Sequence, residues 1–296
     1  MATPLYAIAI RGMKLKPVTG SRADANQTAL ENENAVLLQV AAFGHLRIAE
    51  LAALVWPTSP PASAKEMARR TVRRLVQHKE LLVRRNSLGG ESFVLTRKSA
   101  LRATDLAGHA VGDGYDIQGV AGPTFWHRTL GTSYLAHRLK TEAGVWGEYS
   151  LARAWAPLSA LECARRFGKI PDGLVRLSTE RTRKLGLAPG VAAYQWIEVE
   201  SSFKPKAELE KSLRLAECLE EPLGEGVLVG LVFVLDRCER HEACIRRVAA
   251  RILPKQIELM SFKTAFEAVS IARCELARPL SLRSVEEITL ACDQPL

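Results

Sequence analysis

IPDG at residues 170–173 and YQWIEVE at residues 194–200 are the most informative stretches of this chain. The second stretch is typical of a strand, and side chains two apart on a strand point to the same face. Glu198 and Glu200 would therefore share a face, where Asp172 could join them. Carboxylate oxygens suit a divalent cation, so the pattern predicts an acidic cation site.

The composition is that of an ordinary globular protein, with 47% hydrophobic and 25% charged residues. At 296 residues the chain is long enough for two modest domains. The apolar run over residues 226–235 is far shorter than the roughly 20 residues that a membrane-spanning helix needs. We therefore expect no membrane partner.

Positive charge is concentrated in one block of the chain. The net charge is +9, and residues 65–102 hold eleven Lys or Arg against three Glu. A local basic stripe is typical of a nucleic-acid-binding surface, which makes double-stranded DNA the expected partner. The six cysteines all lie in the C-terminal half without a regular framework, and no signal peptide opens the sequence. These features favour a reducing cytoplasm.

The N-terminal half shows three helical patterns followed by a hairpin pattern. Residues 1–30 lack sustained periodicity and are expected to form a loosely held tail. Trp56-Pro57 ends the second helix, and Asn86-Ser87-Leu88-Gly89-Gly90 is a strong turn signal. The expected helices and strands cover residues 31–43, 48–55, 64–78, 81–85 and 92–96. This order predicts a winged helix-turn-helix domain over residues 31–104.

Residues 105–123 carry five glycines and are expected to be a linker before a second domain at 124–296. In that domain the patterns give a helix, three strands, a helix and a strand. The last strand, Gly226 to Leu235, is apolar throughout, as a strand buried on both faces would be. The expected ranges are 126–141, 145–152, 174–177, 191–200, 205–219 and 226–235, with a further helix at 242–252 and a strand near 256–261.

Three stretches, LAALVWP (51–57), ARRTVRRLVQHKELLVRR (68–85) and ESFVLTRKS (91–99), carry a family resemblance. They are similar to the winged helix of the plasmid replication-relaxation and mobilisation protein C families. The C-terminal half resembles the PD-(D/E)xK restriction-endonuclease-like core, αβββαβ, that these families carry after the winged helix. The resemblance covers most of residues 31–236 and implies a fold with both α-helices and β-strands, α/β in its second domain and α+β overall.

The family pattern implies that Glu148, Asp172 and Glu198 hold Mg²⁺. The lysine expected two residues after the third acid is missing, because Glu200 stands there. The nearest cations are Lys204, Lys206 and Lys211, and relatives with an acid-x-acid strand and a later lysine imply that Lys204 or Lys211 supplies the charge. The expected catalytic residues are Asp172, Glu198, Glu200 and Lys204.

The third helix of a winged helix-turn-helix lies in the major groove, and the wing flanks it. The expected DNA-binding residues lie on that helix and beside the wing: Arg69, Arg70, Arg73, Arg74, Arg84, Arg85, Arg97 and Lys98.

Two other groups of residues contain side chains that can bind metal ions or take part in catalysis. Cys238, His241 and Cys244 form a Cys-x2-His-x2-Cys cluster without a matching fourth ligand, so zinc is not expected. His127 and His137 have no partner that suggests a catalytic triad, and we interpret them as structural or DNA-facing.

These observations support one main hypothesis and two rivals. The main hypothesis is a DNA-binding protein of a plasmid or other mobile element, acting in replication or conjugative mobilisation with other such proteins, and able to nick DNA with Mg²⁺. The first rival is a non-catalytic regulator that carries a degenerate nuclease fold. The second is a nuclease subunit of a transposase or a defence system.

Overall fold

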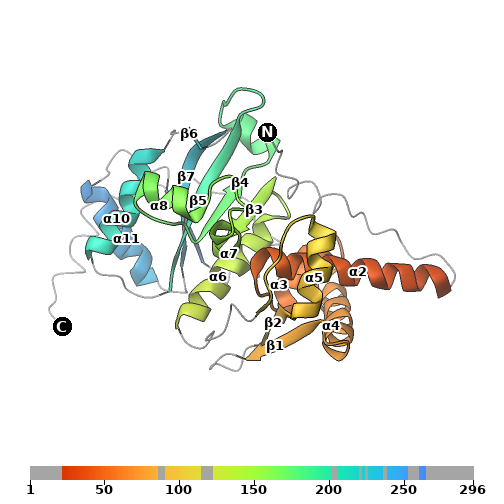
Figure 1. The fold of residues 1–296 in the computed structure, drawn as a ribbon. Coiled ribbons are helices and arrows are strands. Elements are labelled where there is room, and N and C mark those ends of the chain that lie inside the picture. The colour runs from red at the N-terminus through yellow and green to blue at the C-terminus, as the bar shows by residue number, and fades with distance from the viewer. Residues whose placement is uncertain are drawn as a thin grey trace.

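The computed structural model shows a mixed α/β protein, as expected from the sequence (Figure 1). The structure describes residues 22–85, 91–114, 123–201, 206–219, 222–223, 226–235, 239–252 and 260–264. The expected turn at 86–90, residues 115–122 of the expected linker, Lys204 and Cys238 lie outside the described residues.

The N-terminal unit contains helices and one hairpin in the expected order. Its elements are α2 (Arg22–Phe43), α3 (Ile48–Val55), α4 (Pro61–Gln77), β1 (Leu81–Arg85), β2 (Glu91–Leu95) and α5 (Arg97–Ala107). The two strands pair antiparallel, with Leu82 opposite Val94. An isolated bridge between Leu46 and Phe93 attaches the hairpin to the segment before α3.

Local sequence explains where these helices begin and end. Glu50 accepts a hydrogen bond from the backbone N–H of Arg47, which closes the first turn of α3. Pro61 begins α4 at a position where its missing N–H costs nothing. Thr96 caps α5, and Gly108, at φ +73°, ends it in the left-handed conformation.

Two sequence expectations fail in this unit. Helix α2 begins at Arg22, so residues 22–30 are helical and not part of a loose tail. Its first turns are exposed and project from the bundle (Figure 1), so a search for a buried apolar stripe could not detect them. Helix α5 continues to Ala107, so residues 105–107, which were expected to begin the linker, are helical.

The C-terminal unit is a sheet with helices on both faces. Its elements are α6 (Pro123–Arg138), β3 (Gly144–Gly147), α7 (Glu148–Ala152), α8 (Ala160–Phe167), β4 (Gly173–Arg176), α9 (Thr179–Lys184), β5 (Ala192–Glu200), α10 (Lys206–Arg214), the 3-10 turn η2 (Leu215–Cys218), β6 (Pro222–Leu223), β7 (Gly226–Leu235), α11 (Glu239–Ile252) and β8 (Met260–Thr264). The expected order of helix, three strands, helix and strand is confirmed by α6, β3, β4, β5, α10 and β7.

The sheet runs in the order β3-β4-β5-β7-β6, with β8 beside β7. Strand β4 is antiparallel to its neighbours β3 and β5, whereas β7 is parallel to β5 and to β8. The expected extended segment at 145–152 is wrong for its second half, because Glu148 opens α7 directly after β3. The last strand lies at Met260–Thr264, later than expected.

The two faces of β5 belong to two hydrophobic cores. Ala193, Ile197 and Val199 pack with α6 and with the N-terminal bundle. Tyr194 and Trp196 pack on the other face, with Leu213 and the rest of the layer formed by α10 and α11. Because side chains alternate along a strand, Glu198 and Glu200 belong to the face of Trp196.

Candidate functional site

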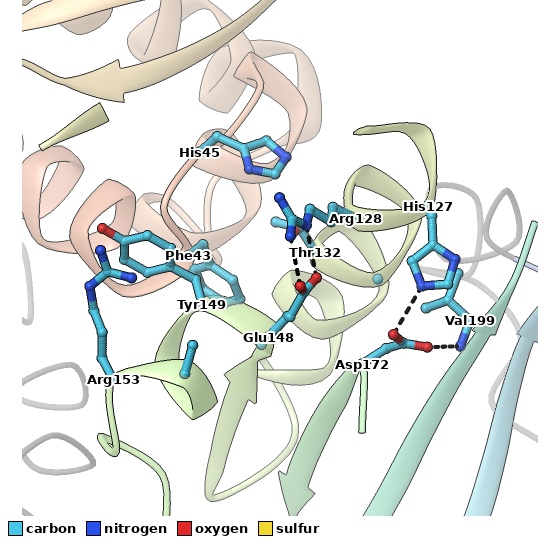
Figure 2. Close-up of a pocket in the computed structure, with 13 residues that line it drawn as sticks. Phe43, His45, His127, Arg128, Thr132, Glu148, Tyr149, Arg153, Asp172 and Val199 are labelled. Carbon is cyan, nitrogen blue, oxygen red and sulfur yellow. Dashed lines mark hydrogen bonds and ion pairs between the residues drawn. The ribbon is translucent and has the colours of Figure 1, made fainter. Parts of the chain in front are cut away.

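Asp172 lies just before β4, where its backbone N–H donates to the carbonyl oxygen of Ile197 over 3.1 Å. The register of β4 and β5, with Gly173 opposite Ile197, brings it beside the carboxyl end of β5. Its Oδ2 accepts a 2.7 Å hydrogen bond from the backbone N–H of Val199, and its Oδ1 lies 2.9 Å from Nε2 of His127 (Figure 2). Two independent elements therefore hold this carboxylate in place.

Glu198 is fully buried on the neighbouring strand and has three polar neighbours. Trp196 Nε1 donates to its Oε1 over 2.6 Å, and the ammonium of Lys169 contacts its Oε2. The same ammonium lies 2.5 Å from Oγ of Ser212 on α10. Burial and the nearby charge of Asp172 raise the pKa of Glu198 to about 7, although Lys169 acts in the opposite direction. Burial is the larger cause of the raised pKa, and the charge of Asp172 adds to it.

Glu148 lies elsewhere, at the N-terminus of α7. Arg128 binds both of its carboxylate oxygens, at 2.9 and 2.8 Å, and this pairing raises the pKa of Arg128. Glu148 and Asp172 line one pocket between α6, α7 and the end of α2, together with Phe43 and other residues (Figure 2). Glu198 is on the opposite face of the sheet from the Val199 side chain that lines this pocket.

The structure thus brings together the expected site residues only in pairs. Asp172 is near Glu198 on one side and shares a pocket with Glu148 on the other, while Glu200 is buried at the end of β5. No group of three or more His, Cys, Asp or Glu within the described ranges is arranged to hold a metal ion. Of the Cys-x2-His-x2-Cys residues, where zinc was not expected, only Cys244 has a described side chain, and it is partly buried.

The sequence interpretation missed residues that tertiary contacts bring to Asp172. His127 is not an isolated structural histidine, because it contacts Asp172 and its Nδ1 lies 3.4 Å from Oγ of Ser201. Lys169 is only three residues before Asp172, and this short separation in the sequence is the signal that could have identified Lys169 as a site residue. His137 is different: its Nδ1 lies 2.8 Å from a backbone oxygen on its own helix, and burial lowers its pKa.

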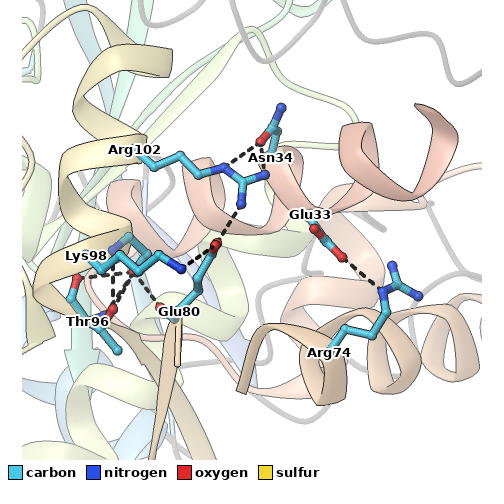
Figure 3. A network of polar contacts seen from close by, with 8 residues as sticks. Glu33, Asn34, Arg74, Glu80, Thr96, Lys98 and Arg102 are labelled. Carbon is cyan, nitrogen blue, oxygen red and sulfur yellow. Dashed lines mark hydrogen bonds and ion pairs between the residues drawn. The ribbon is translucent and has the colours of Figure 1, made fainter. Parts of the chain in front are cut away.

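The basic residues of the N-terminal unit fall into two groups. Arg69, Arg70, Arg73, Arg85, Arg97 and Lys98 are exposed, and Arg74 and Arg84 are partly buried. Arg74 pairs with Glu33 at 2.9 Å and Lys98 with Glu80 at 3.6 Å (Figure 3). On the hairpin, Arg85 pairs with Glu91 at 3.1 Å. Arg102 also pairs with Glu80, at 2.6 Å, although the sequence analysis did not predict a role for it.

Comparisons with known proteins give no family. No family model, no curated protein and no solved structure matches the chain. Within the part of the chain that the structure describes, no helix is both long and apolar enough to cross a membrane.

Proposed function

We propose that this chain binds double-stranded DNA through its N-terminal unit and that this unit is a winged helix-turn-helix. The supporting observation is the two-sided character of α4. Its exposed face carries Arg69, Arg70 and Arg73. Its opposite face is buried in the bundle through Ala64, Ala68, Thr71, Val72 and Leu75. A helix whose opposite face is packed in the bundle and whose outer face carries three exposed arginines fits insertion into a major groove.

The contacts of these arginines leave them available to a phosphate or a base. Arg69 and Arg70 approach Glu66 only at 3.7 and 3.9 Å. The side chains of Arg69, Arg70 and Glu66 are all more than half exposed. Exposed ion pairs of this length contribute little free energy and exchange readily for a phosphate. Arg74 differs, because Glu33 of α2 already holds it at 2.9 Å.

Fluorescence anisotropy with labelled duplex DNA tests the proposal. We expect the double variant Arg70→Ala/Arg73→Ala to bind more weakly and to lower the slope of log K against log salt by about two, because each phosphate contact contributes about one. The matched control is Arg165→Ala/Arg183→Ala, which removes two exposed arginines from α8 and α9. Equal losses of duplex affinity in both double variants would show only a general effect of net charge and would contradict the assignment of DNA binding to α4.

The setting that we propose is plasmid replication or conjugative mobilisation, and it rests on the family resemblance of the N-terminal stretches. Selection of bound sequences from a random duplex library tests it. A selected sequence that recurs at a replication origin or transfer origin supports the setting. Sequences from transposon ends, or no selected sequence at all, would favour the rivals.

A second candidate function is Mg²⁺-dependent cleavage of the bound DNA. The observation that favours it is the register of β4 and β5, which places Asp172, just before Gly173, beside the strand end that carries Glu198. Burial raises the pKa of Glu198, and the nearby charge of Asp172 raises it further. Two carboxylates that repel one another are stabilised by a divalent cation. An ion held by Asp172 and Glu198 would have to displace protein partners from their oxygens, as an ion at Glu148 would have to displace Arg128. Glu148 is set apart from this pair because its pocket lies on the opposite face of the sheet from Glu198.

Asp172 and Glu198 would hold the ion, which when bound supplies a Lewis acid for a phosphate oxygen and an activated water. The protein's own contribution is positional. The backbone N–H of Val199 and the ring of His127 orient Asp172, and Trp196 fixes Glu198 in the dry core beside it. Glu200, at the buried end of β5, is then a structural acid.

Conversion of supercoiled plasmid to the nicked form, with Mg²⁺ or with EDTA, tests this candidate. We expect Asp172→Asn to lose cutting and to keep duplex binding, because asparagine can still accept the Val199 hydrogen bond. Glu148→Gln should keep cutting. DNA binding without metal-dependent nicking by the wild-type protein would leave the non-catalytic regulator as the better account.

A further inference from the structure

His127 of α6 lies between a carboxylate and a hydroxyl. Its Nε2 is 2.9 Å from Oδ1 of Asp172, and its Nδ1 is 3.4 Å from Oγ of Ser201. Asp172 comes just before β4 and Ser201 directly follows β5, so three separate elements bring these side chains together. A hydroxyl, an imidazole and a carboxylate in this order are the parts of an activated serine nucleophile. The two partners are 45 and 74 positions from His127, so no local pattern records the group.

The hydrogen bonds decide which ring nitrogen is the base. Oδ2 of Asp172 accepts from the backbone N–H of Val199, which fixes the carboxylate from a second side. A carboxylic acid loses its proton more readily than an imidazolium does, so the proton between Asp172 and His127 belongs to Nε2. In the neutral ring Nδ1 then carries no proton and can accept that of Ser201. A nucleophile and its base are often this far apart before a substrate draws them together.

A pocket of about 180 Å³ opens beside this group (Figure 2). His127, Asp172 and Val199 are among the residues that line it. Ser201 comes two residues after Val199 and therefore lies on the same face of the sheet, as its contact with His127 shows. The side chains of His127 and Asp172 are 24% and 23% exposed. A small molecule in the pocket would thus meet the base and the acid directly.

The charges along the pocket favour an uncharged substrate. Arg128 pairs with Glu148, as the imidazole pairs with its acid, and the pocket's other arginine, Arg153, lies over the ring of Tyr149 at 3.7 Å. A phosphodiester would bring a further negative charge beside these acids, whereas a carboxylic ester brings none. Phe43 and Tyr149 offer apolar contacts to an acyl group. Glu148 takes only two of the five N–H groups of Arg128, so the pocket also holds a charged donor for an oxygen that gains negative charge.

We propose that Ser201, His127 and Asp172 form a serine hydrolase site for small, uncharged carboxylic esters, an activity separate from DNA binding and from metal-dependent cleavage. Oγ of Ser201 bonds to the carbonyl carbon while its proton moves to Nδ1 of His127. The bond from that carbon to the alcohol oxygen breaks, and His127 gives the proton to the leaving alcohol. Water then bonds to the carbonyl carbon and passes a proton through His127 back to Ser201 as the acid is released. Asp172 keeps its charge and holds the ring.

A fluorophosphonate probe, which bonds covalently to activated serines, tests the site in the full chain with EDTA present. We expect mass spectrometry to find the label on Ser201. His127→Ala should slow labelling at least about 100-fold, which is the usual effect of losing a general base, and added imidazole should restore part of the rate. A purely structural histidine would not give this rescue. The matched control is His137→Ala, which removes the other partly buried histidine of α6 and should label as the wild type does.

Asp172 is a positioning residue in this scheme, and its variants test the direction of the hydrogen bonds. The amide of Asp172→Asn can donate to Nε2 and so favours the ring form that carries its proton on Nδ1. That form cannot accept the proton of Ser201, so labelling should slow at least about 100-fold. Asp172→Glu keeps a carboxylate and should restore part of the rate. Hydrolysis of 4-nitrophenyl acetate should follow the same order among the variants.

Three results would overturn the proposal. The first is a wild-type protein that carries no label on Ser201, and the second is equal labelling of the wild type and His127→Ala. The third is nicking of DNA in EDTA that is lost in Ser201→Ala, because this would assign the serine to a phosphodiester in place of an ester. Labelling needs no metal ion, so its outcome and that of the Mg²⁺-dependent nicking assay are independent.

Discussion

His45 is a residue whose pKa is set mainly by burial. It is 4% exposed in the segment between α2 and α3, and burial lowers its pKa from 6.5 to about 4, with Glu50 acting in the opposite direction. Between these two values the unfolded chain binds a proton that the folded chain does not. The free energy of unfolding should therefore rise from pH 4 to pH 6.5, by about 3 kcal/mol in all from this residue.

Urea denaturation at several pH values checks the pH dependence. His45→Gln cannot titrate and should lose less stability on acidification than the wild type does, although it is less stable at pH 7.5. Identical pH profiles for the two proteins would mean that other groups cause the acid sensitivity.

At the scale of elements, the ion pair between Arg74 and Glu33 braces α4 against α2 (Figure 3). The pair is partly exposed, so Arg74→Ala should lower the free energy of unfolding by no more than about 1 kcal/mol. Under the proposed function, Arg74→Ala should also weaken duplex binding less than Arg73→Ala does, because Glu33 already neutralises Arg74. Thermal melts and anisotropy of the two single variants measure these effects. A larger loss of affinity in Arg74→Ala would assign Arg74 to the DNA-binding face.

At the scale of the whole molecule, the N-terminal bundle and the sheet share one hydrophobic core. The cluster that begins at Val36 and Leu37 continues through Leu130 and Leu135 of α6 to Ile197 of β5. The hydroxyl of Ser150 on α7 donates to the carbonyl oxygen of Ala42 over 2.6 Å, across the same boundary. We therefore expect a single cooperative unfolding transition in place of two separate ones.

Gly44 lies at this boundary and provides a matched test. It has φ +78°, and a Cβ at this position would lie 2.6 Å from Cδ2 of the Tyr149 ring. Gly108 has φ +73° but open space around its Cβ position. Gly108→Ala should cost about 1–2 kcal/mol from backbone strain, and Gly44→Ala about 1–3 kcal/mol more from overpacking. Hydrogen exchange should show both units losing protection together in Gly44→Ala. Loss confined to the N-terminal unit would contradict the shared core.

Much of the fold could be predicted because the responsible signals are local. Trp56-Pro57 ends α3, α4 has one buried and one exposed face, and Gly226–Leu235 is an apolar strand. Each of these signals depends on residues that are close together in the sequence. The boundaries at α2 and α7 were missed for a physical reason as well. The first turns of α2 pack against little, and Glu148 begins a helix directly after a strand, so neither carries a clear hydrophobic period.

The sequence by itself determined the mixed α/β order of elements, the basic face of α4 and the shared face of Glu198 and Glu200, because all three depend on the spacing of neighbouring residues. Only the tertiary structure decided which residue each of the acids contacts. It paired Glu148 with Arg128, Asp172 with His127 and Glu198 with Lys169. These pairs join residues 20 to 45 positions apart, and strand register and helix docking, which no local pattern records, bring them together.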